Sequence, residues 1–301
     1  MTMNSRYTIK KFLLFTLAFS GLSLGADGGH PLSMWQLDGQ QNSIYLLGSI
    51  HLLREKDHPI PSVIYDAYND AETLIMELDM DDLDPIASQT MATELGLIQD
   101  DRTLADLMGP DLYAEAEALA LAAEIPLKLL SRAEPWYAAM NVELMLLMRI
   151  GFNPAYGIET HLMEMAKADQ KEILGFETMR QQLDFLDGLS PGAQRELFMQ
   201  ALSEGEAMRE LMDSMIEAWR HGDMEFMEDN LLSDMQDYPE LNQTIVVDRN
   251  LDWTSQIEDL MDDEIDYLVI VGTLHLVGDE GVPELLTGRG HSVTQLHQTA
   301  N

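Results

Sequence analysis

Two histidines in this sequence each follow an apolar, strand-like segment. Residues 45–53 (YLLGSIHLL) and 267–277 (YLVIVGTLHLV) both place a glycine three positions before the histidine, which gives His51 and His275. Continuous apolar runs that end in glycine are typical of buried strands. Imidazole nitrogens transfer protons and bind divalent metal ions. Because α/β sheets bind ligands just beyond the carboxyl ends of their strands, the two histidines predict one shared site.

Two glutamates also end apolar, strand-like segments. Glu77 lies in the segment 73–78 (TLIMEL), and Glu177 follows the segment 172–176. A carboxylate in such a place is costly to bury unless it is paired or binds a metal. Two histidines and two glutamates suit a divalent ion such as Zn, Mn, Co or Fe. The ion would lower the pKa of a bound water, and a nearby carboxylate would act as the base, so this set predicts hydrolysis.

The two glutamates also fit a structural role, which the pattern leaves equally open. Glu77 and Glu177 would then cap helix N-termini or pair with Arg249 or Arg180. A lone histidine beside a glycine is likewise more often a capping or packed residue than a ligand. The repetition of the glycine–histidine spacing favours the site.

Other chemistry finds less support. The sequence has no GxSxG, no HExxH, no phosphate loop and no cysteine, which argues against serine hydrolases, P-loop enzymes and thiol enzymes. Glu159 and His161 fall at the start of a predicted helix but do not share a helical face, so they are poorer ligands. Methionines at helical spacing, such as Met208, Met212 and Met215, are typical of core packing rather than of a copper site.

The order of the elements predicts an α/β fold. Strands are expected at 34–37, 44–48, 73–78, 172–176, 267–272 and 292–296, the first two as a hairpin. Between about residues 84 and 237, apolar residues recur three and four positions apart, which predicts a long helical insertion. We therefore expect a mixed sheet from two pseudo-symmetric strand units that close on one site, all within a single domain over residues 26–301.

The N-terminal residues and the composition indicate an exported protein. Three basic residues precede the apolar residues 12–24, and Ser23 and Gly25 have the spacing that signal peptidase favours, so residues 1–25 read as a cleaved signal peptide. We expect a periplasmic or secreted protein with no stable membrane insertion after cleavage. The formal net charge of −36 argues against nucleic acid as a partner.

Taken in order, the motifs resemble the TraB/GumN family. This family belongs to a superfamily with the Tiki metalloproteases and, more distantly, the erythromycin esterase and ChaN-like proteins. The resemblance covers about residues 33–297 and rests on YLLGSIHLL (45–53), ELD (77–79), GIETHL (157–162), GFET (175–178) with Gln181 or Gln182 after it, W-x-x-GD (219–223), DRN (248–250) and GTLHLVGDEGVPELL (272–286).

The resemblance implies a mixed α/β fold. From the Tiki branch it implies a peptidase whose metal ion is Mn or Co rather than Zn. His51 and His275 match the paired histidines of the family, and Glu77 and Glu177 match its acidic strand ends. Arg249 matches the middle of the usual ERN, in which this chain has Asp248 instead of glutamate.

We therefore expect an exported metal-dependent hydrolase that acts on a peptide or another small substrate. His51, His275, Glu77 and Glu177 would hold the ion, with Glu77 or Glu177 as the general base and Arg249 as the stabiliser of developing charge. The alternative is a binding or regulatory protein that captures a peptide, a metal or haem on the same fold. Ester hydrolysis, as in the erythromycin esterase relatives, is a third reading of the same site.

Overall fold

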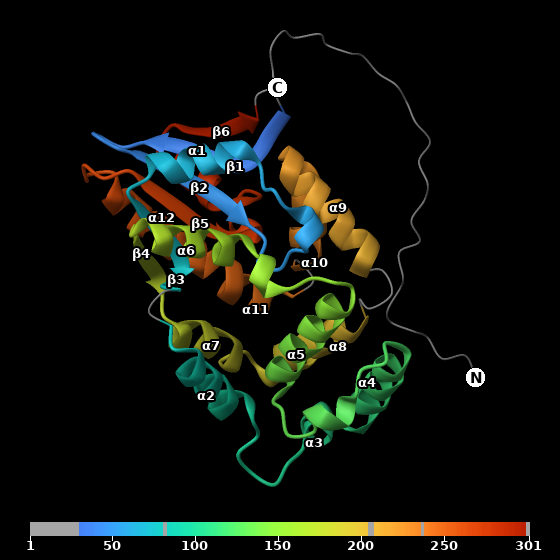
Figure 1. Cartoon of the computed structure of the whole chain (residues 1–301). Coiled ribbons are helices and arrows are strands. Elements are labelled where there is room, and N and C mark those ends of the chain that lie inside the picture. The colour runs from blue at the N-terminus through green and yellow to red at the C-terminus, as the bar shows by residue number, and fades with distance from the viewer. Residues whose placement is uncertain (1–29, 81–82, 204–207, 236–237, 299–301) are drawn as a thin grey trace.

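The computed structural model describes residues 30–80, 83–203, 208–235 and 238–298 (Figure 1). The predicted signal peptide, residues 1–25, lies outside these ranges. Within them, no helix combines the length and the apolar character that crossing a bilayer requires.

Six strands form one mixed sheet in the order β4-β3-β5-β2-β1-β6. The strands β4, β3, β5 and β2 run parallel, whereas β1 is antiparallel to both β2 and β6. The predicted α/β fold, its hairpin and its mixed sheet are thereby confirmed. The strand bounds are β1 (His30–Asp38), β2 (Ser43–Ser49), β3 (Thr73–Leu78), β4 (Glu172–Glu177), β5 (Tyr267–Gly272) and β6 (Val293–Gln298).

The two glycine–histidine segments are direct neighbours in the sheet. In the parallel pair of β2 and β5, Gly48 lies opposite Val271, and Ser49 lies opposite Gly272. The two copies are therefore one residue out of register. The chain also continues differently after each strand, because β5 leads into a short 3-10 helix, η5 (Thr273–Leu276), whereas β2 leads into a loop.

Helices cover both faces of the sheet. The side chains of Leu268 and Ile270 belong to one core, and those of Val269 and Val271 belong to another, as expected for a strand that is buried on both sides. Burial of each such side chain contributes about 1.5–3 kcal/mol. The first core contains α1 (Ser62–Asp70), α6 (Ile158–Asp169) and α9 (Met208–His221), and the second contains α12 (Asp248–Leu260) and α13 (Val282–Gly288).

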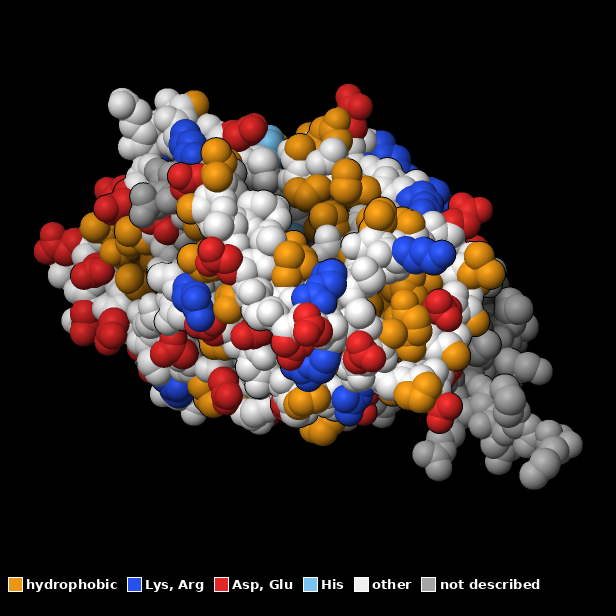
Figure 2. Space-filling model, turned by 90° about the horizontal axis from the view of Figure 1, so that it is seen from below, with side chains coloured by type: hydrophobic (Ala, Val, Ile, Leu, Met, Phe, Trp, Pro, Cys, Tyr) orange, Lys and Arg blue, Asp and Glu red, His pale blue; other side chains and the backbone are white. Residues whose placement is uncertain are grey.

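Most helices of the predicted insertion form a layer below the sheet in Figure 1, whereas its helices α6 and α9 pack on the sheet. The core of this layer includes Ala116, Val142 and Phe198, which are fully buried away from the sheet. Seen from below in Figure 2, hydrophobic side chains gather around a hollow near the centre of this end, with charged side chains around them. The helices of this layer are α2 (Pro85–Gly96), α3 (Leu104–Met108), α4 (Pro110–Ala122), α5 (Pro135–Arg149), α7 (Met179–Asp187) and α8 (Pro191–Ser203). The last helix of the insertion, α10 (Met224–Met235), packs against α9, and α11 (Pro239–Asn242) follows the insertion.

The insertion also returns to the sheet. Between α6 and α7 the chain forms β4, which pairs with β3 in parallel and places Leu78 opposite Glu177. The insertion thus supplies the strand at one edge of the sheet, and it brings Glu177 next to Glu77.

Candidate functional site

The predicted residues lie together at the carboxyl ends of four parallel strands. In the spatial order of the strands, Glu177 ends β4, Glu77 lies near the end of β3, His275 follows β5 and His51 follows β2. This edge is where the carboxyl ends of parallel strands meet and where α/β sheets bind ligands. The fifth predicted residue, Arg249, comes from the first turn of α12, and the structure brings all five together.

The guanidinium of Arg249 lies at the centre of this group. Its Nε and Nη2 donate to the two oxygens of Glu177 at 2.8 and 2.9 Å, and Nη2 also donates to Glu77 Oε2 at 2.7 Å. Its Nη1 donates to His275 Nε2 at 3.1 Å and to the carbonyl oxygen of Ile245 at 3.2 Å. Ile245 belongs to a π-helical turn, Gln243–Val247, that leads into α12. The pairing of both glutamates with Arg249, one of the alternatives from the sequence, is thus observed.

Glu177 is enclosed by hydrogen-bond donors. Besides Arg249, its Oε1 accepts from the indole Nε1 of Trp253 at 3.0 Å, and its Oε2 accepts from Gln182 at 3.1 Å. The same Gln182 amide donates to Glu77 Oε2 at 3.1 Å. The side chain of Glu177 is only 5% exposed. It therefore holds Arg249 in place and has little access to a substrate.

His275 is held as a neutral imidazole. Its Nδ1 donates to Asn250 Oδ1 at 2.7 Å, and the Asn250 amide in turn donates to the carbonyl oxygen of Glu280. This leaves Nε2 as the acceptor for Arg249. Burial lowers the pKa of His275 to about 3, although the charge of Glu77 acts in the opposite direction.

His51 has the opposite environment. Its side chain is 59% exposed, and its Nδ1 lies 2.6 Å from Glu159 Oε1. The negative charge of Glu159 raises the pKa of His51 to about 10. Glu159 itself is buried in the first turn of α6, where the helix N-terminus favours a carboxylate, and it also accepts the hydroxyl of Ser49. His51 and Glu159 form a dyad with the free Nε2 turned toward Glu77.

A small gap separates His51 from Glu77. The atoms His51 Nε2 and Glu77 Oε1 are 4.0 Å apart, and the backbone N–H of Gly272 donates to the same Oε1 at 2.8 Å. A Cβ atom on Gly272 would lie 3.3 Å from Glu77 Oε1 and 3.4 Å from His51 Nε2. Because φ of Gly272 is −53°, its backbone does not require glycine. A side chain at this position would, however, crowd both groups.

Glu77 remains ionised beside this gap. Burial opposes its ionisation, but the imidazolium of His51, the guanidinium of Arg249 and the N–H of Gly272 hold the pKa of this carboxyl below its usual value. Its Oε2 is bound to Arg249 and Gln182, whereas its Oε1 faces His51. Glu77 can therefore orient a small polar group with Oε1.

The predicted ligand set does not match the arrangement that an ion requires. In the described parts of the chain, no three or more His, Asp and Glu side chains are grouped so that they could hold a metal ion. Glu77 Oε2, both oxygens of Glu177 and His275 Nε2 are turned to Arg249. The positions of these ligand atoms do not fit the expected divalent ion. The ion itself remains a prediction from the sequence.

The sequence pattern did not single out Glu159 as the partner of His51. The available signal was its place in the first turn of a helix directly after Gly157. A Cβ atom on Gly157 would come within 2.1 Å of the carbonyl oxygen of His51, so this glycine lets the start of α6 approach the His51 loop. His161, the other candidate in that motif, lies away from the site. Its Nε2 shares a hydrogen bond with the hydroxyl of Tyr65 at 3.1 Å.

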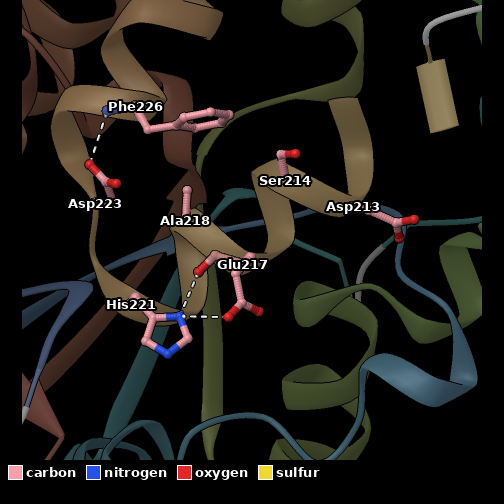
Figure 3. A pocket seen from close by; sticks show the side chains of 7 residues that line it. All are labelled: Asp213, Ser214, Glu217, Ala218, His221, Asp223 and Phe226. Carbon is pink, nitrogen blue, oxygen red and sulfur yellow. Dashed lines mark hydrogen bonds and ion pairs between the residues drawn. The ribbon is translucent and has the colours of Figure 1, made fainter. Parts of the chain in front are cut away.

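A separate surface cavity of about 640 Å³ lies between α9 and α10. Figure 3 shows its lining, in which His221 contacts Glu217 and the acidic side chains Asp213 and Asp223 lie apart from each other. None of the predicted site residues lines this cavity. Its exposed, like-charged lining offers no group of convergent polar atoms of the kind that binds a small molecule.

The lowered pKa of His275 predicts a loss of stability in acid. An unfolded chain protonates this histidine near its ordinary pKa of 6.5, whereas the folded chain does so only near 3. The unfolded state therefore binds more protons between these values, and the free energy of unfolding should fall by about 2 kcal/mol between pH 7 and pH 5 from this group. Urea unfolding at both pH values should show that His275→Gln lacks this part of the decrease. The exposed His297→Gln serves as the control and should keep it; equal pH dependence in both variants would contradict the assignment.

Comparison with known proteins places these residues in a family. The model of the TraB/PrgY/gumN family matches residues 33–295. Proteins described as uncharacterized protein YbaP are 24% identical in Shigella flexneri, over 83% of this chain and 89% of theirs, and 23% identical in Escherichia coli (strain K12), over 80% and 87%. An uncharacterized protein of Treponema pallidum (strain Nichols) is 26% identical over 50% of this chain and 45% of its own length. No solved structure matches.

Proposed function

This chain belongs to the TraB/PrgY/gumN family, and from the geometry of its site we propose that it is an exported hydrolase of peptide bonds. His51 is its acid–base group, and Glu77 positions the attacking water. The sequence pattern of residues 1–25 supports export. The resemblance to the Tiki branch supports peptides over esters as the substrate.

The gap at Gly272 is the observation that carries this proposal. A water in the gap would lie within hydrogen-bond reach of both His51 Nε2 and Glu77 Oε1, which are 4.0 Å apart. The gap borders the exposed imidazole of His51, so a substrate carbonyl can approach it from solvent. A general base must lie within hydrogen-bond reach of the proton that it removes, and His51 meets this requirement.

The proton transfers of the reaction depend on the charges around His51. Neutral His51 takes a proton from the water at Nε2 while the water oxygen bonds to the substrate carbonyl carbon. Glu159, bonded to Nδ1, stabilises the imidazolium that forms, as a buried carboxylate does in hydrolase triads. The imidazolium then gives the proton to the leaving nitrogen as the carbon–nitrogen bond breaks. The products are a carboxylic acid and an amine, which exchange a proton to become a carboxylate and an ammonium group, and His51 is neutral again.

Filling the gap should abolish hydrolysis without unfolding the protein. In Gly272→Ala the new methyl group would lie 3.3 Å from Glu77 Oε1 and 3.4 Å from His51 Nε2 and would crowd a water bound between them, whereas φ of −53° is allowed for alanine. We expect the rate of hydrolysis of a mixed peptide library, followed by mass spectrometry, to fall by about 10²-fold or more. Gly288→Ala is the matched control, because a Cβ there meets nothing within 4 Å. Wild-type rates in Gly272→Ala would overturn the placement of the water, and absence of cleavage in the wild type would overturn the peptidase function.

A further inference from the structure

We propose that Arg249 is the built-in cation of this site and that the site works without a divalent metal ion. The inference rests on the proposed hydrolase function for its chemistry, but the arrangement of the ligands carries it. Three of the four residues that were expected to surround an ion, Glu77, Glu177 and His275, bind a guanidinium instead. The shape of this guanidinium, its charge and its hydrogen-bond partners each support this role.

The acceptor atoms are arranged to match the planar set of N–H groups on a guanidinium. Glu177 receives two parallel hydrogen bonds from Nε and Nη2 of Arg249, which is the bidentate geometry that a guanidinium forms with a carboxylate. The distances from Arg249 nitrogens to Glu77, Glu177 and His275 run from 2.7 to 3.1 Å. These atoms are spread along a flat cation, and an ion would need them around one point at about 2.0–2.3 Å.

Arg249 already supplies one positive charge to the two carboxylates of this group, which together with it carry a formal charge of −1. Arg249 is 7% exposed, and its charge lies between two carboxylates whose side chains are 13% and 5% exposed. A divalent ion next to Glu77 would be in contact range of a fixed positive charge, which disfavours its binding. The guanidinium also cannot lose its proton to make way for an ion.

The partners of His275 support the same conclusion. Asn250 holds the imidazole with Nδ1 as donor, so that Nε2 presents a lone pair. In a metal site such a contact turns the lone pair toward the ion. Here the lone pair receives Arg249 Nη1, which makes His275 a positioning residue for the guanidinium.

Binding of Mn²⁺ and Co²⁺ tests the inference separately from activity. Because the formal net charge is −36, divalent ions will bind weakly at many places on the surface. The wild type must therefore be compared with the double variant His51→Gln/His275→Gln. Calorimetric titration with MnCl₂ and the visible spectrum with CoCl₂ should be the same for both proteins. One tight ion per chain that is present in the wild type and lost in the double variant would overturn the proposal.

The rate of peptide hydrolysis after treatment with a chelator is the second test of the inference. If the wild type cleaves peptides, its rate should be unchanged after EDTA treatment and should not rise when Mn²⁺ or Co²⁺ is added back. A rate that disappears with EDTA and returns with the ion would refute the inference while leaving the hydrolase intact. If no peptide is cleaved under any condition, the proposed function fails, and the titration still decides whether Arg249 stands in for an ion.

Discussion

Replacing Arg249 with alanine should lower the free energy of unfolding by about 3–5 kcal/mol, because the variant leaves two carboxylates buried without their counter-charge. Glu77 and Glu177 have side chains that are 13% and 5% exposed, and both bind the guanidinium. Urea unfolding at neutral pH would measure the change. Part of the loss should be recovered when Glu177→Gln is added to the variant, since this removes one of the unpaired charges.

Arg180→Ala is the matched control for this prediction. Arg180 pairs with Asp184 on the surface of α7, where the two side chains are 57% and 47% exposed. An exposed pair of this kind contributes about 0–1 kcal/mol. If Arg249→Ala lowers the free energy of unfolding no more than Arg180→Ala does, the guanidinium is not the centre of a buried charge network. The inference that Arg249 takes the place of a metal ion would then be wrong.

Replacing His51 with glutamine should lower the rate of peptide hydrolysis by about 10²–10⁴-fold, the usual contribution of a positioned acid–base group. Glutamine keeps a donor for Glu159 but cannot carry a proton between the water and the leaving group. Because the side chain is 59% exposed, the fold should be retained, which circular dichroism would verify. His297→Gln, an exposed histidine in β6, should hydrolyse peptides like the wild type.

The pH profile separates this role from a structural one. Since the pKa of His51 is raised to about 10, most of the free protein carries imidazolium at pH 7, and the neutral base becomes more abundant as the pH rises. The wild-type kcat/KM should therefore increase about tenfold per pH unit above pH 7 and level off near pH 10. His51→Gln should lose this slope. A wild-type profile that is flat from pH 7 to pH 10 would contradict His51 as the base.

The fold and the meeting of the site residues were accessible from the sequence. Apolar runs ending in glycine predicted the strands, and parallel strands bring their carboxyl ends to one edge, so His51, Glu77, Glu177 and His275 had to converge. The pairing of the glutamates with Arg249 was among the alternatives. Sequence spacing could not choose between that pairing and an ion, because the choice depends on the direction of individual side-chain atoms.

The difference between the two histidines was hidden in the sequence. Both follow the same glycine spacing, yet His51 is exposed beside a carboxylate, and His275 is 4% exposed beside an amide and a guanidinium. The one-residue offset between β2 and β5, and the 3-10 helix after β5, place the two imidazoles in different surroundings. Such an offset arises from pairing across the sheet, which a local pattern does not encode.

The central place of β5 has a consequence for how the molecule assembles. This strand is made almost last, yet it lies between β2 and β3, which are made early. A growing chain that stops before Tyr267 can pair β1 with β2 and β3 with β4, but it still lacks β5, the strand that pairs with both ribbons. Since long-range pairing of this kind is slow, the joining of the ribbons should be a late folding step. Because Gly272 ends β5 and lies beside both Glu77 and His51, the proposed site is complete only after that step.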